Sequence, residues 1–125
     1  MADSFWAIPD AAAIRTPLSI LREQASALTQ QTQGVLVGEA ATKSKGDDLV
    51  VSLDIVVPGV NDYRYRVLMY EQPLEMYPGS FRAPVDALSK TIADETSFVA
   101  AVKAALSSQK VKNALTSLLA QVSGA

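Results

Sequence analysis

The first third of the chain repeats apolar residues at helical spacing. The repeating positions are Ile14, Leu18, Leu21, Ala25 and Leu28. This spacing gives one apolar stripe on an amphipathic helix. Thr16 places a capping hydroxyl directly before Pro17, which is tolerated at the first helical position. Gly34 suits a left-handed helix end. The pattern therefore predicts a helix over residues 16–33, approached by a segment over residues 1–15.

From residue 35 the apolar pattern alternates and β-branched residues become frequent, which is typical of strands. The predicted strands are 35–42, 49–57 and 63–71, joined by polar turns at 43–48 and 58–62. Short turns of this kind favour an antiparallel meander. The second strand places Leu49, Val51, Leu53, Ile55 and Val57 on one face. The third places Tyr63, Tyr65, Val67 and Met69 opposite Arg64, Arg66, Leu68 and Tyr70.

The alternating Tyr-Arg-Tyr-Arg run at 63–66 superficially resembles a surface that stacks bases and binds phosphates. Alternation places the tyrosines and arginines on opposite faces of the strand, so they cannot act on one base. If residues 58–62 form the loop, Val57 pairs with Tyr63, and Asp54 lies opposite Arg66. The sequence therefore favours a cross-strand ion pair between Asp54 and Arg66.

Three prolines and a glycine interrupt residues 72–84, which leaves room only for a short edge strand at 75–77 or 80–82. Two helices are expected next, over 94–107 and 109–121, with Asp94 as the cap of the first and Ser107-Ser108 as the break. The order α-β-β-β-(β)-α-α predicts an α+β fold. It comprises a three- to four-stranded antiparallel β-meander, with the N-terminal helix and two C-terminal helices packed on one face.

The length favours a single domain over residues 1–125. Its expected parts are the approach segment 1–15, the helix 16–33, the sheet and proline-rich loop 35–84, and the two helices 94–122.

Histidine and cysteine are both absent from the 125 residues. This removes the usual proton shuttle, the thiolate nucleophile and the commonest ligands of transition metals. No Gly-x-Ser-x-Gly elbow, glycine-rich phosphate loop or calcium loop occurs. We therefore expect no enzyme activity, no metal and no cofactor.

The net charge and the hydropathy of the chain restrict its expected binding partners and its expected cellular location. A net charge of −2 and a pI near 5.0 make nucleic-acid binding unlikely, even for a helix-turn-helix interpretation of the last two helices. No run of about 18 apolar residues is present, and the start lacks the pattern of a secretory signal, so we expect no membrane contact and a cytoplasmic location.

Most carboxylates occupy ordinary turn or cap positions, which favours structural roles. Glu71 and Glu75 flank the proline-rich loop, and two carboxylates suffice for glycoside hydrolysis. A small-ligand-binding domain, or a carboxylate-dependent hydrolase with a site near residues 70–82, is therefore the alternative function.

The leading hypothesis is a non-enzymatic protein–protein interaction or assembly module, either inhibitor-like or immunity-like or a scaffold. With 49% hydrophobic residues, the chain has apolar surface available for an interface. The partner is a protein or a second copy, with a homodimer favoured. The candidate interaction surface comprises Arg64, Arg66, Tyr70, Glu75, Tyr77, Phe81 and Arg82, although the position of the rings in an irregular loop favours a role in the core for the aromatic residues among them.

Overall fold

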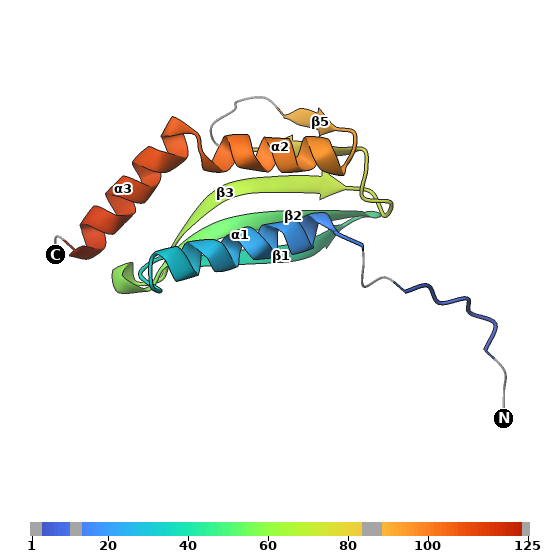
Figure 1. The fold of residues 1–125 in the computed structure, drawn as a ribbon, viewed down its shortest axis with the longest axis horizontal. Helices are drawn as coiled ribbons and strands as arrows, with labels where there is room; N and C mark the ends of the chain where they lie inside the picture. Colours follow the sequence, from blue (N-terminus) through green and yellow to red (C-terminus); the bar gives the residue numbers. More distant parts are fainter. Residues whose placement is uncertain (1–3, 11–13, 84–88, 124–125) are drawn as a thin grey trace.

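The computed structural model describes residues 4–10, 14–83 and 89–123, and Figure 1 shows their arrangement. The helices are α1 (Pro17–Gln31), η1 (Pro58–Val60), α2 (Glu95–Leu106) and α3 (Gln109–Ser123). The strands are β1 (Val37–Lys45), β2 (Asp48–Val57), β3 (Tyr63–Gln72), β4 (Gly79–Arg82) and β5 (Lys90–Ile92). They form one antiparallel sheet in the order β1-β2-β3-β4-β5. The predicted α+β fold is confirmed.

The ends of α1 follow the predicted capping chemistry. The Thr16 hydroxyl accepts a hydrogen bond from the Ser19 backbone N–H at 3.0 Å, and Pro17 begins the helix. Beyond its end Gly34 adopts a φ of +81°, and its N–H donates to the Thr29 carbonyl at 2.8 Å. Ile14, expected on the apolar stripe, instead precedes the helix and is exposed.

The pairing of β2 with β3 confirms the predicted register near the turn, with Val57 opposite Tyr63 and Asp54 opposite Arg66. The register then shifts between Leu53 and Asp54, so that Leu53 pairs with Leu68. A bulge of this kind inserts an extra residue and reverses the faces beyond it. The predicted face assignment of β3 is therefore wrong after the shift.

The sheet has five strands rather than the predicted three or four. β4 confirms the second of the two proposed edge-strand positions. β5 pairs Ile92 with Gly79 and Lys90 with Phe81, and no strand was predicted there. Three residues are too few to show an alternating pattern, and only pairing with β4 defines them as a strand.

One face of the sheet is covered by helices (Figure 1). α1 packs mainly on β1 and partly on β2, whereas α2 packs on β3 and β5. Between the sheet and α2, the buried Phe98 ring lies 4.9 Å from Tyr70 and 6.2 Å from Phe81, measured between ring centroids. α3 diverges from α2 and touches η1 at one end of the sheet.

Among the described residues, no helix is both long and apolar enough to span a bilayer.

Candidate functional site

The opposite face of the sheet has no helix over it in the described part of the chain. At its centre, Ser52, Asp54 and Val56 of β2 are nevertheless buried. Long side chains from the two neighbouring strands flank them, among them Glu39 on β1 and Arg66 on β3. We call this side of the sheet the open face. Long charged side chains lie over the buried row formed by Ser52, Asp54 and Val56.

An ion-pair network crosses this open face. The Arg66 Nε donates to Asp54 Oδ1 at 2.7 Å, and an Arg64 Nη1 donates to Asp54 Oδ2 at 3.2 Å. Arg64 also pairs with Glu39, and its hydrogen bonds, first to Glu39 and then to Asp54, raise the pKa of its guanidinium. The predicted Asp54–Arg66 pair is confirmed. Both arginines are already engaged by carboxylates of their own sheet, which opposes the phosphate-binding interpretation.

A second charged cluster surrounds a small hollow of about 100 Å³ farther along the open face, lined by residues of β1, β2, β3 and β4. Lys45 Nζ lies 3.0 Å from Glu71 Oε1, and its hydrogen bond is the main cause that lowers the pKa of Glu71. A hydrogen bond to Glu71 raises the pKa of Asp48. Arg82 lines the same hollow. The two carboxylates are open to solvent, so the hollow gives neither of them a water-excluded site.

The residues predicted from the proline-rich loop separate into different environments. Tyr70 and Phe81 are buried in the core, which corrects their assignment to an interaction surface. The Tyr70 hydroxyl donates to the Met76 carbonyl at 2.7 Å, and burial raises its pKa to about 12. Tyr77 is half-buried and lies near the Phe98 ring, at 6.4 Å between centroids. These rings anchor the loop to the sheet.

The remaining predicted residues are exposed, but they come from separate elements of the fold. Arg64, Arg66 and Arg82 lie on the open face, on β3 and β4. Glu75 is exposed in the loop between those strands. Arg64 and Arg66 therefore belong to the ion-pair network around Asp54, Arg82 lines the separate hollow beside Glu71, and Glu75 lies outside both.

A groove on the helical face was not predicted from the sequence. Its deep part is a cavity of about 200 Å³ whose floor comprises Leu53, Ile55 and Val67, with walls from Leu28 of α1 and Leu115 of α3. Leu106 at the end of α2 also lines it. We call this hollow, together with its extension between α1 and α2, the helical groove. Its lining is drawn from five elements, which explains why no single sequence pattern revealed it.

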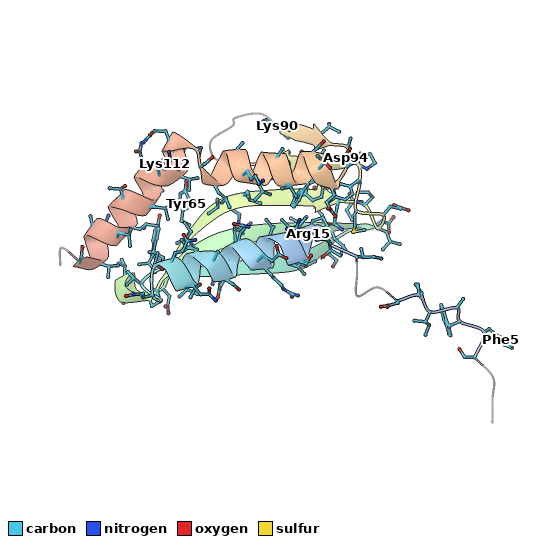
Figure 2. All side chains as sticks on the ribbon, in the orientation of Figure 1. Phe5, Arg15, Tyr65, Lys90, Asp94 and Lys112 are labelled. Atoms are coloured by element: carbon cyan, nitrogen blue, oxygen red, sulfur yellow. The ribbon has the colours of Figure 1, made fainter. Side chains whose placement is uncertain are left out.

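Segment 4–10 is a second feature that no sequence pattern assigned to a site. Phe5 is 100% exposed, Trp6 84% and Ile8 83%. Figures 1 and 2 show the segment extending away from the sheet and helices, with the Phe5 side chain far from them. Phe5 and Trp6 therefore do not pack among the aromatic residues of the proline-rich loop. None of the described residues covers the apolar side chains of this segment.

Within the described residues, no group of three or more histidine, cysteine, aspartate or glutamate side chains could hold a metal ion. Comparisons with protein-family models, with curated proteins and with solved structures found no match to this chain. The open face, the helical groove and segment 4–10 are therefore the features of the molecule that bear on its function.

Proposed function

We propose that this chain is a non-enzymatic protein-interaction module that binds a protein partner through segment 4–10. The observation that supports this is the exposure of Phe5, Trp6 and Ile8 within four consecutive positions. Single exposed apolar residues are normal on protein surfaces, whereas a group this dense marks a contact site. The groups needed for most enzyme chemistry, histidine and cysteine, are missing from the chain.

The energetics favour docking of this segment onto a partner. Full burial of each of the three side chains contributes about 1.5–3 kcal/mol. Aromatic anchors also dominate the energetics of many interfaces because they fill pockets with few rotatable bonds. Ordering the segment costs roughly 0.5–1.5 kcal/mol for each rotamer-rich side chain. Pro9 lowers the backbone part of this cost, because its ring fixes one dihedral angle before binding.

The test compares the full chain with a variant in which Phe5→Ser, Trp6→Ser and Ile8→Ser are combined. Each protein is immobilised, exposed to extract from its source organism, and the retained proteins are quantified by mass spectrometry. Leu74→Ser is the matched control, because Leu74 is also strongly exposed (78%) but lies in the proline-rich loop. The proposal predicts a protein, which can be the chain itself, that the full chain and the control retain and the triple variant loses. Equal retention by all three proteins would refute it.

A further inference from the structure

We propose that α3 is a hinged lid over the deep cavity of the helical groove. The lid is closed in this structure, with its far end held against η1, and it opens as an intact helix about Ser107-Ser108. This device is independent of segment 4–10 and controls access to the apolar floor of the cavity.

α3 buries few side chains for a helix of its length. Of its 15 residues, Val111 and Leu118 are buried. Its principal contacts are with α2, from which it diverges, and with η1 (Figure 1). A helix seated along its whole length usually has about three to four core-facing side chains in every two turns. The packing that holds α3 in place is therefore small.

Two hollows lie between α3 and the strands. The deep cavity of about 200 Å³ lies along Val111 and Leu115, and a second hollow of about 300 Å³ lies between Leu118 and the rings of Tyr63 and Tyr65. Well-packed protein interiors contain few voids larger than a water molecule. α3 therefore crosses the end of the sheet without interdigitating closely with it, so that little packing has to be undone for the helix to move.

The Ser107-Ser108 junction has the chemistry of a hinge. The Ser107 hydroxyl donates to the Lys103 carbonyl at 2.7 Å, so this bond stays with α2. The Ser108 hydroxyl accepts from the Val111 N–H at 3.3 Å, so the N-terminal cap of α3 moves with α3. Rotation between the two serines breaks the bonds from Ser108 to the Ala105 carbonyl, at 3.2 Å from its N–H and 2.7 Å from its hydroxyl. Both helices keep their internal hydrogen bonds while the angle between them changes.

Val122, near the other end of α3, holds the lid closed. A Cβ atom at Gly59 of η1 would lie 3.3 Å from a Val122 methyl and 4.0 Å from the Val122 Cβ. That separation suits a disulfide, whose two Cβ atoms lie about 3.5–4.5 Å apart. Because the chain has no cysteine of its own, a cysteine pair at these two positions locks the lid without competing native thiols.

Thiol labelling of a buried floor position measures the opening. Val67 lines the deep cavity and is 1% exposed. Val51 is the matched control, because it is 2% exposed in the same core but does not line the cavity. We expect iodoacetamide to modify Val67→Cys at least tenfold faster than Val51→Cys, as measured by intact mass spectrometry. Opening of the lid exposes the first thiol, whereas the second requires unfolding of the core.

The disulfide tests whether α3 is the element that moves. Gly59→Cys and Val122→Cys are added to Val67→Cys and oxidised, and peptide mapping verifies that the bond joins residues 59 and 122. We expect this lock to slow labelling of the floor thiol at least tenfold, to the rate of Val51→Cys. The control carries Gly59→Ser and Val122→Ser, which have nearly the same side-chain volume but form no bond, and its labelling should stay fast.

Three results would overturn the inference. Equal labelling of Val67→Cys and Val51→Cys would mean that the floor becomes accessible only when the whole chain unfolds. Fast labelling that the disulfide does not slow would assign the opening to another element. Hydrogen exchange of the α3 amides with the same opening equilibrium as the floor thiol would mean that the helix melts instead of swinging. We expect those amides to be protected at least tenfold more strongly than the thiol.

Discussion

Replacement of Gly38 by alanine tests how α1 is seated on the sheet. A Cβ atom at Gly38 would lie 2.4 Å from the Ala25 carbonyl oxygen and 2.5 Å from the Ala25 Cα. Optimal contacts between carbon atoms are about 3.5–4.0 Å. Both obstructing atoms belong to the helix backbone, so no side-chain rotation can relieve the clash. The helix must move about 1 Å away from β1 to accept the methyl group.

The cost of that movement follows from what holds α1 in place. Overpacking of this kind costs about 1–3 kcal/mol, and the upper end applies because backbone must shift. The movement also breaks a bond, since the Thr29 hydroxyl accepts from the Gly38 N–H at 2.9 Å and donates to the Ala25 carbonyl at 3.1 Å. A lost hydrogen bond adds about 1 kcal/mol. We expect Gly38→Ala to lower the free energy of unfolding by about 3–4 kcal/mol.

Urea unfolding followed by circular dichroism measures this change. Gly59→Ala is the control, because a Cβ there meets only the Val122 side chain, at 3.3 Å or more, which a shift of a few tenths of an ångström relieves, and we expect a loss below about 1 kcal/mol. Adding Ala25→Gly to Gly38→Ala should not restore stability, because the obstruction is the Ala25 backbone rather than its methyl group. A loss below about 1 kcal/mol for Gly38→Ala, or rescue by Ala25→Gly, would refute the reasoning.

Two further predictions concern the core hydroxyl and the open face. Tyr70 ionises near pH 10 when unfolded and near 12 when folded, so the unfolded state releases its proton first. Stability should therefore fall by about 2–3 kcal/mol as pH rises from 10 to 12. In Tyr70→Phe, urea unfolding should show a weaker dependence over that range, with about 1 kcal/mol lost at pH 7 because the bond to the Met76 carbonyl is gone. On the open face, Arg66→Ala should lower the thermal midpoint more than Arg64→Ala. Arg66 makes the shorter bond to the buried Asp54, whereas Arg64 divides its contacts between two carboxylates; a reversed order in calorimetry would contradict this.

The sequence predicted those parts of the fold that depend on local chemistry. The Thr16 cap, the Gly34 helix end and the Ser107-Ser108 break all appear where expected, because each depends on a few neighbouring residues. The Asp54–Arg66 pair was predictable for the same reason, since the length of a single turn sets the register beside it.

Features that depend on distant residues were not predictable from pattern alone. The bulge in β3 could not be predicted from the sequence. Val67 and Leu68 are adjacent apolar residues that are both buried, so the alternation of apolar and polar residues does not mark the shift in register. The candidate surface failed in part for a related reason. Tyr70 and Phe81 looked like loop aromatics, yet α2 brings Phe98 against both of them and completes a core that only the tertiary fold defines.

The seating of α1 and the openness of the helical groove have one physical origin. The missing side chain at Gly38 and the Thr29 hydrogen bond draw α1 over the edge strand β1, while α2 packs on the other side, on β3 and β5. A five-stranded sheet is about 19 Å wide, so two helices of about 10 Å diameter could cover it only if they were evenly placed. With α1 held at the edge, Leu53, Ile55 and Val67 in the middle strands form the floor of a hollow that neither helix fills. The same contact that stabilises the fold therefore leaves an apolar hollow of about 200 Å³ beside α1.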